Sequence, residues 1–338
     1  MVSERKMAVT VPIAKTPSHS HSNQVFSIFQ RYRLVDWATQ GYMLLVAFLI
    51  LLFHNDTVPH PYLLITAHFV VIGCVHLLIL FGERYPENKI LHFLRSYYPI
   101  LLYTGFYRET GLLNRMFLTH FVDDWLIHLE EKIFGFQPAI LFMEKFPQRW
   151  IAEILYASYF SYYLMIAGIG LALYLRDHKA FTHFLTTVSI LFYLCYLTYI
   201  ILPVGGPRIF WVHYPELASN STNYLAVGAA HPFPPSVQKA IFYKIMLFIY
   251  DHFEAAGAAF PSSHVAVAWC TVWFSFRYLR KIRWIHAFAA LLLSISTVYG
   301  RYHYVLDVVG GVLTALILVP LIDRLYRAWE QHRAENKS

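Results

Sequence analysis

The chain has 338 residues, of which 57% are hydrophobic and only 14% are charged, and its mean hydropathy is +0.45. A soluble domain carries about 25% charged residues, so this composition excludes an ordinary water-soluble protein and indicates an integral protein of the cell or inner membrane. The net charge of +7 comes from basic residues between hydrophobic runs, a pattern typical of the membrane surface. The sequence has no basic face with aromatic platforms, so it does not predict nucleic acid as a partner.

The N-terminal residues 1–34 are polar and contain no apolar run suited to a signal peptide core. We expect a cytoplasmic tail there, ending in a short interfacial stretch from Phe26 to Tyr32. Eight segments that follow are apolar enough to cross a bilayer, which takes about 20 residues. They are Trp37–Phe53, Pro61–Phe81, Ile90–Phe106, Ile151–Leu175, Phe181–Leu202, Ser263–Leu279, Ile285–Arg301 and Tyr304–Ile322. The sequence therefore predicts an all-α fold, a polytopic transmembrane helix bundle of about eight spans.

Two long insertions separate these spans. Residues 107–149 include DDWLIHLEEKIFGF, whose apolar residues recur at helical spacing, as expected of a helix lying at the membrane interface. Residues 203–261 contain seven prolines and form a loop, within which IFYKIMLFIYDHF is too short to span and predicts a second interfacial helix. We expect four parts: a tail at 1–34, N-terminal spans with interfacial helices at 35–149, a catalytic membrane domain at 150–322, and a cytoplasmic tail at 323–338.

The basic residues predict the orientation of the bundle. If both termini lie on one side, that side carries 17 of the 27 lysines and arginines, and the opposite side carries most of the rest in two long loops, which count little. We therefore expect cytoplasmic termini and an outer or periplasmic loop at 203–261. The three cysteines, Cys74, Cys195 and Cys270, lie scattered in apolar runs, which indicates neither a disulfide framework nor a zinc site.

Ionisable residues at membrane depth are costly and usually functional. Three polar clusters stand out, and the expected topology places all three at the outer face. The first is ILPVGGPR, which ends at Arg208. The Arg208 guanidinium suits phosphate, and we expect Gly205 and Gly206 of the same motif to leave their backbone N–H groups open to an anion. The alternative is a loop arginine that contacts lipid headgroups. The second is AAFPSSH, in which Ser262, Ser263 and His264 open a helix whose N-terminus favours an anion; a plain helix cap is the alternative.

The third cluster is STVYGRYHYVLDVVGG, which contains Arg301, His303 and Asp307. His303 and Asp307 are four residues apart and share a face if they lie on a helix. The carboxylate then holds one ring nitrogen and leaves the other free as a nucleophile. A purely structural His–Asp pair is the alternative reading.

Taken together, the three clusters resemble the phosphatidic acid phosphatase type 2 superfamily, which also includes the vanadium haloperoxidases. PSSH is similar to its PSxH motif and HYVLD to its HxxxD motif, over residues 150–322. The resemblance implies a six-helix-type phosphatase core and a phosphohistidine intermediate, with a membrane lipid phosphate as substrate and neither a metal nor another cofactor. It also implies roles: His303 as nucleophile, Asp307 orienting it, His264 as acid, and Arg208, Arg301, Ser262 and Ser263 holding the phosphate.

Two positions depart from the superfamily pattern. The arginine usually found six residues before the motif histidine is Thr297 here, and we expect Arg301 to replace it from the same helix face, one turn away. The lysine usually found seven residues before the first motif's arginine is Ile201. LPVGGPR and the DDWLIHLEEKIFGFQP block are more similar to the branch containing inositol phosphorylceramide synthases, which implies transfer of a phospho-headgroup to a lipid alcohol. Water and an alcohol both remain candidate acceptors.

Other functions are compatible with a polytopic bundle. A haem or metal protein is one, because His68 and His76 lie two turns apart in one span, although a polar spot between helices explains them as well. A transporter or a non-catalytic lipid-binding scaffold is another, and it predicts that function survives the loss of His303.

Overall fold

The computed structural model describes residues 31–212 and 232–335, so most of the expected interfacial stretch from Phe26 to Tyr32 lies outside the described residues. The described residues form helices joined by loops, with one isolated parallel bridge between Val204 and Ala258. The long helices are α2 (Leu34–Phe53), α3 (Pro61–Arg84), α4 (Lys89–Leu113), α7 (Arg149–Arg176), α8 (His178–Ile201), α13 (Ser263–Tyr278), α14 (Arg283–Tyr299) and α15 (Val305–Glu335). The shorter ones are α5 (Asp123–Phe134), α6 (Pro138–Lys145), α9 (Pro207–Val212), α11 (Pro235–Gln238) and α12 (Ile241–Phe253).

Each of the eight expected spans is a helix, and the all-α polytopic bundle is confirmed. Five of them, α2, α3, α7, α8 and α15, are long and apolar enough to cross a membrane. The others fall short for identifiable reasons: α4 contains Arg95 and Pro99, and α13 and α14 have only 16 and 17 residues. α15 continues past Ile322 to Glu335, through the segment expected to be a tail.

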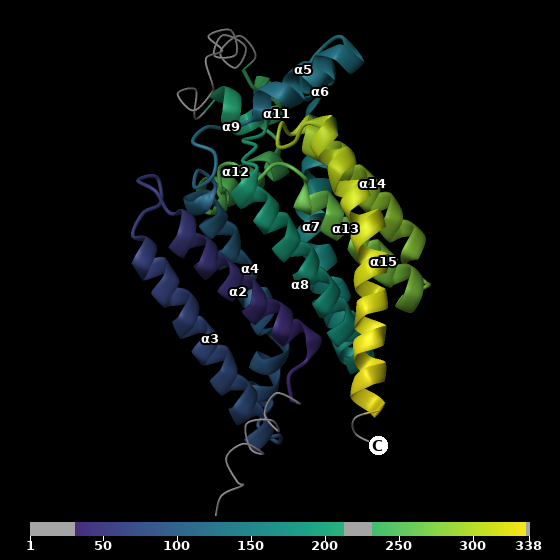
Figure 1. The fold of residues 1–338 in the computed structure, drawn as a ribbon. Coiled ribbons are helices and arrows are strands. Elements are labelled where there is room, and N and C mark those ends of the chain that lie inside the picture. Colours follow the sequence, from purple (N-terminus) through teal and green to yellow (C-terminus); the bar gives the residue numbers. More distant parts are fainter. Residues whose placement is uncertain (1–30, 213–231, 336–338) are drawn as a thin grey trace, which may run out of the picture.

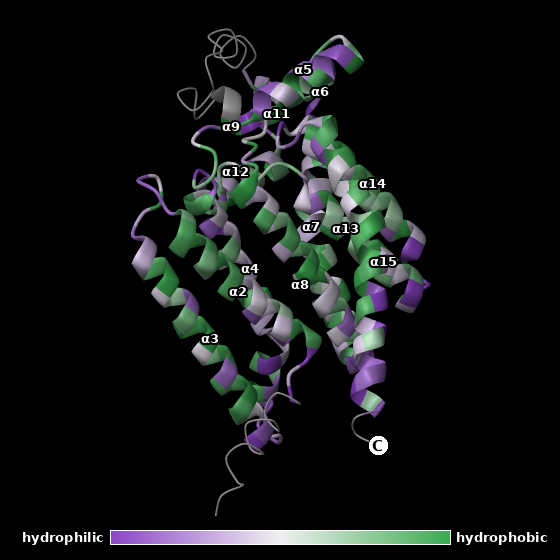
Figure 2. Cartoon of the chain, in the orientation of Figure 1, coloured by the Kyte–Doolittle hydropathy of each residue, from purple (hydrophilic) through white to green (hydrophobic). Residues whose placement is uncertain are grey.

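The helix α8 stands at the centre of the bundle. It packs against α2, α4, α7, α13 and α15, and 72% of its apolar window is buried. α3 lies at the margin, beside α2 and α4, with only 17% of its window buried (Figure 1). Many large apolar side chains of the long helices are exposed, and hydrophobic residues predominate along these helices in Figure 2. A surface of this kind is suited to lipid rather than to water.

Buried ion pairs join the helices at one end of the bundle. On one side, Arg95 of α4 and the Tyr98 hydroxyl both donate to the Asp36 carboxylate of α2, with Nη1 and Oη each 2.6 Å from Oδ1. On the other, Asp323 of α15 accepts from Arg277 of α13 at 2.7 Å and lies 3.1 Å from the His183 Nε2 of α8. Because breaking a buried pair leaves an uncompensated charge, these contacts fix which helices are neighbours.

The short helices gather at the opposite end of the bundle. α5, α6, α9 and α11 lie over the ends of the long helices, and α12 lies just beneath them (Figure 1). The segment IFYKIMLFIYDHF forms α12 as expected, a helix of 13 residues that is too short to span. This end holds the three polar clusters, so the short helices surround the candidate site.

Candidate active site

Backbone hydrogen bonds connect the segments that carry the sequence motifs. They run from Val122 N to Pro203 O (2.9 Å), from Ala259 N to Val204 O (2.9 Å), from Arg208 N to Arg301 O (2.8 Å) and from Ser262 N to Asp307 O (3.0 Å). Four segments that are far apart in the chain are thus fixed to one another at their main chains. The side chains between these bonds are held in a defined arrangement.

The His303 imidazole faces the Asp307 carboxylate, with Nδ1 3.4 Å from Oδ2. The same oxygen accepts the backbone N–H of Tyr304 at 2.8 Å. His303 lies just before α15, and Asp307 is in its first turn, so the expected contact forms although only one of the two residues is helical. Burial lowers the pKa of the His303 ring to about 3, so the ring is neutral at pH 7 and retains a lone pair.

The second histidine of the cluster, His264, lies in the first turn of α13. Its ring centroid is 5.8 Å from that of His303. Two tyrosines of α7 hold it from the other side, with centroids at 4.6 Å for Tyr162 and 5.3 Å for Tyr159. The two imidazoles therefore share one site, and aromatic packing rather than a carboxylate positions His264.

The two serines open α13. The Ser262 Oγ accepts the backbone N–H of Val265 at 3.3 Å, and the backbone N–H of Ser263 donates to the Tyr199 hydroxyl at 3.0 Å. Ser262 is therefore a helix cap in this structure, as the simpler alternative predicted. The start of α13 lies tightly against α15, because a Cβ on Gly311 would be 2.5 Å from the Ser262 carbonyl oxygen.

Arg208 brings a buried positive charge to the site and is only 7% exposed. Its guanidinium lies over the rings of Tyr250 and Tyr302, at 5.2 and 5.5 Å from their centroids. It also donates to the Tyr302 hydroxyl at 3.4 Å and pairs with Asp251 at 3.5 Å. Asp251 is half-exposed, so this pair is accessible to solvent and to an incoming anion.

We expected Arg301 and Thr297 to lie on the same helix face, and in the structure they do not. α14 ends at Tyr299, and Arg301 follows it with a φ of 61°, so the two residues do not share a helix face. The Arg301 side chain is directed toward Glu144, with Nη2 3.8 Å from Oε1, and its guanidinium lies 4.8 Å from the Phe233 ring centroid. The Arg301 carbonyl oxygen is part of the site, because it accepts from Arg208 N. The Arg301 guanidinium contacts Glu144 and Phe233, which lie outside the histidine pair.

The expectation that the Gly205 and Gly206 amides are open to an external anion is wrong for this structure. Both donate to the buried Asp123 carboxylate, at 2.7 and 2.8 Å, and the Tyr304 hydroxyl donates to it at 2.9 Å. Gly206 has a φ of 81°, and a Cβ there would lie 2.8 Å from the Tyr302 carbonyl oxygen. The two amides thus bind the protein's own carboxylate, and this contact fixes the loop beside the catalytic segment.

A second carboxylate of α5 supports the start of α15. The Glu130 Oε1 accepts the backbone N–H of Leu306 at 2.9 Å. Burial raises the pKa of both Asp123 and Glu130 to about 7. Sequence reasoning missed both residues, although the signal was present: with Leu126 and Ile127 they occupy the i, i+3, i+4, i+7 positions of the buried face of α5.

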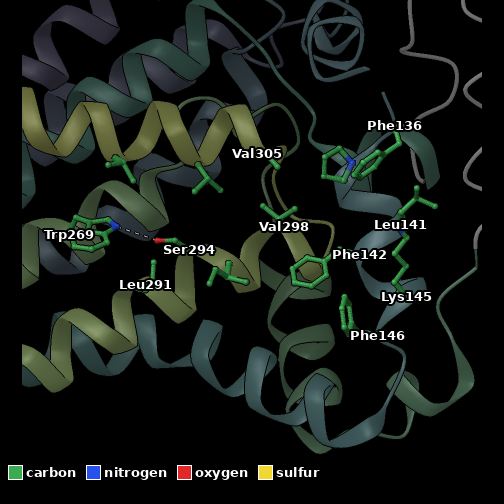
Figure 3. Close-up of a pocket in the computed structure, with 14 residues that line it drawn as sticks. Phe136, Leu141, Phe142, Lys145, Phe146, Trp269, Leu291, Ser294, Val298 and Val305 are labelled. Carbon is green, nitrogen blue, oxygen red and sulfur yellow. Dashed lines mark hydrogen bonds between the residues drawn. The ribbon is translucent and has the colours of Figure 1, made fainter. Parts of the chain in front are cut away.

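Two cavities lie between the helices. The larger, of about 720 Å³, lies between α4, α7, α8 and α12 and reaches Ser263 and His264. The smaller, of about 520 Å³, lies between α6, α13, α14 and α15 and contains none of the sequence-predicted site residues. Figure 3 shows it lined by apolar side chains, with Trp269 donating to Ser294. Of these two cavities, the larger therefore reaches His264.

Within the described ranges, no group of three or more His, Cys, Asp or Glu side chains is arranged to hold a metal ion. The two histidines of α3 have separate partners. His68 Nε2 lies 3.4 Å from Glu109, and the Tyr32 hydroxyl lies 2.6 Å from His76 Nδ1. They are polar contacts between helices.

The family model of the PAP2 (phosphatidic acid phosphatase type 2) superfamily matches residues 124–321, more than half of the chain. The chain belongs to the PAP2 superfamily. With its five apolar helices it is an integral membrane protein, and superfamily membership makes it a phosphatase-type enzyme whose substrate class is a lipid phosphate. The matched range begins in α5, ahead of the expected domain start at residue 150. No curated protein and no solved structure matches the chain significantly.

Proposed function

We propose that this PAP2 protein transfers the phosphoryl group of a membrane lipid phosphate through a phosphohistidine on His303. The observation that supports this most directly is the buried His303 ring, which faces Asp307 and lies beside His264. Asp307 faces Nδ1, which leaves Nε2 as the nitrogen that attacks phosphorus. An acid, a nucleophile and an orienting carboxylate are then present within one site.

The first step forms a bond between His303 and phosphorus and breaks the bond between phosphorus and the lipid oxygen. His264 protonates the leaving alkoxide, while Asp307 stabilises the charge that develops on the His303 ring. Arg208, with Ser262 and Ser263, holds the phosphate oxygens in the proposed complex. Phosphoryl transfer depends mainly on such positioning and charge stabilisation, which supports a mechanism without a metal ion.

The second step transfers the phosphoryl group to an acceptor, for which water and a lipid alcohol are the two candidates. Two features favour a lipid alcohol. Ile201 occupies the position where the superfamily usually has a lysine, and the larger cavity brings an apolar passage to His264. The similarity to the inositol phosphorylceramide synthase branch also favours a lipid alcohol as the acceptor.

The phosphoenzyme is the decisive species to measure. We expect acid-quenched reactions with a labelled lipid phosphate to yield phosphohistidine in the wild type and none in His303→Ala. His264→Ala should retain the label and should slow turnover of alkyl phosphates far more than that of aryl phosphates, whose leaving group needs little protonation. Asp307→Asn should fold and lose most of its rate. His252→Ala, on the exposed side of α12, is the matched control.

The outcomes of this experiment separate the assigned roles. Label that persists in His303→Ala and disappears in His264→Ala would reverse the two histidines. Label that persists in both variants would overturn the phosphohistidine mechanism. Activity should also persist in EDTA and be inhibited by vanadate, which mimics phosphate; strict dependence on magnesium would contradict the proposal.

A further inference from the structure

The first turn of α15 receives carboxylates from two directions. Asp307 lies within this turn, and its Oδ2 accepts the backbone N–H of Tyr304 at 2.8 Å. Glu130 reaches the turn from α5, and its Oε1 accepts the backbone N–H of Leu306 at 2.9 Å. Carboxylates are favoured at a helix N-terminus, because the first N–H groups have no partner within the helix. Two acidic side chains from distant parts of the chain therefore lie at the helix end that follows His303.

Each of these two carboxylates has one oxygen that remains unsatisfied. Glu130 and Asp307 are both 0% exposed. Within residues 31–212 and 232–335, Glu130 Oε2 and Asp307 Oδ1 are buried and have no hydrogen-bond partner. A buried ionised carboxylate without a donor is energetically costly, and a second like charge close by adds repulsion to that cost. A single proton held by the pair removes one of the two charges, so this arrangement favours one charge over two.

Among the described residues, the groups that shift the ionisation of Glu130 include no positive charge. Burial raises the pKa of Glu130 to about 7, and the negative charge of Asp307 adds to the rise while the Leu306 N–H opposes it. In the segment before α15, the charge of Arg301 faces Glu144 instead. Glu130 shares the buried face of α5 with one other titratable residue, Asp123. The charged or titratable side chains of α5 that lie off this face are Asp124, His128, Glu131 and Lys132.

The two carboxylates differ in the groups that surround them. Asp307 Oδ2 lies 2.8 Å from the Tyr304 nitrogen and 3.4 Å from His303 Nδ1, and the His303 ring gains positive charge as it attacks phosphorus. We propose that Glu130 is a positioning residue for this reaction: it holds the proton of the pair and so leaves Asp307 as the charged partner that orients His303. The proposal rests on the proposed function, because it concerns how Asp307 serves the nucleophile.

The proton on Glu130 acts on the nucleophile only through Asp307. When Glu130 loses this proton, two negative charges lie at one buried helix end, and their repulsion weakens the contact between Asp307 and His303 Nδ1. The proton goes to solvent and not to the substrate, and no bond to phosphorus forms or breaks at Glu130. Glutamine stays neutral at every pH, and its side-chain oxygen can still accept the Leu306 N–H. Glu130→Gln therefore reproduces the protonated state permanently.

The test measures turnover of an aryl phosphate by the full chain in detergent from pH 6 to pH 9. An aryl leaving group needs little protonation, so the titration of His264 contributes little to this profile. The ratio of Glu130→Gln turnover to wild-type turnover should rise by at least about tenfold over this range, as expected when one ionisation is removed. Glu131→Gln, on the exposed side of the same helix, is the matched control, and its ratio to the wild type should stay constant.

A second variant separates the proton from the contact to Leu306. Glu130→Ala removes both, so its ratio to the wild type should start lower at pH 6 and rise with pH in the same way. A purely structural role predicts ratios that are the same at every pH. That result, or ratios that fall as the pH rises, would overturn the role of Glu130.

Trapping of phosphohistidine by acid quench in the same samples distinguishes this proposal from the proposed function. Labelled phosphohistidine in the wild type, combined with a constant Glu130→Gln ratio, would overturn the positioning role and leave the proposed function intact. Labelled phosphohistidine combined with a rising ratio is the result we expect. Absence of the label in the wild type would overturn both.

Discussion

At the scale of single residues, Asp123 connects two segments of the site. It accepts three hydrogen bonds, from the Gly205 and Gly206 amides and from the Tyr304 hydroxyl. The two glycines belong to the loop that ends at Arg208, and Tyr304 directly follows His303. A carboxylate outside the three polar clusters therefore connects the loop of Arg208 to the segment of the nucleophile.

We expect Asp123→Asn to destabilise the protein by about 1–3 kcal/mol, because the amide group turns a donor toward a buried N–H or O–H. Turnover should fall as well, since the loop next to Arg208 loses its anchor. Thermal unfolding and turnover in detergent measure the two effects. Asp56→Asn, on the exposed α2–α3 loop, should change neither; equal effects from both variants would contradict the positioning role.

The same residue predicts a pH dependence. Burial raises the pKa of Asp123 from its ordinary value of 3.8 to about 7, so the folded state binds the proton more tightly than the unfolded state. The stability that this proton contributes is fully present below pH 3.8 and is lost as the pH rises through about 7. The stability of the wild type relative to Asp123→Asn should therefore fall between pH 5 and pH 8, as measured by unfolding at each pH; a rise would contradict the assignment.

At the scale of helices, the contact between α13 and α15 brings the PSSH and HYVLD motifs together. Gly311 permits this approach, since a Cβ there would be 2.5 Å from the Ser262 carbonyl oxygen and 3.0 Å from the Val265 Cβ. Neither atom is the end of a flexible side chain. A substitution at Gly311 therefore has to move one helix relative to the other, and Asp307 and Ser262 with them.

We predict that Gly311→Ala destabilises the protein by about 1–3 kcal/mol and reduces turnover through the displacement of Asp307. Gly73→Ala in α3 is the matched control, because no atom lies within 4 Å of its added Cβ and alanine favours a helix. Unfolding in detergent and turnover of a lipid phosphate provide the measurements. Wild-type behaviour of Gly311→Ala would mean that the two helices adjust without affecting the site.

Much of this arrangement followed from sequence, because helices and their apolar runs are local. The eight helical segments, the α12 helix and the contact between His303 and Asp307 all depend on spacing along the chain. Arg301 could not be placed in this way, since its conformation depends on where α14 ends and on a positive φ. The Gly205–Asp123 contact spans 82 residues, and no local pattern reports which anion a pair of amides binds.

At the scale of the whole molecule, the orientation in the membrane is a prediction that labelling can check. In a background with Cys74, Cys195 and Cys270 replaced by alanine, Lys239→Cys lies just before α12, near the site, and Arg280→Cys lies between α13 and α14 at the other end. Both positions are exposed. We expect an impermeant reagent to label the first in intact cells and the second only after lysis; the reverse pattern would place the site on the cytoplasmic side.

The wall that α4 contributes to the larger cavity has a consequence for how this enzyme diversifies. The residues matching the superfamily begin at 124, whereas Phe93 and Tyr107 belong to a helix that ends before that point. One wall of the cavity thus lies outside the stretch that carries the reaction motifs, while α7, α8 and α12 supply the other walls from within it. In the proposed function, where this cavity admits the lipid, a change in α4 would reshape one apolar wall while every histidine, arginine and carboxylate of the reaction stayed in place.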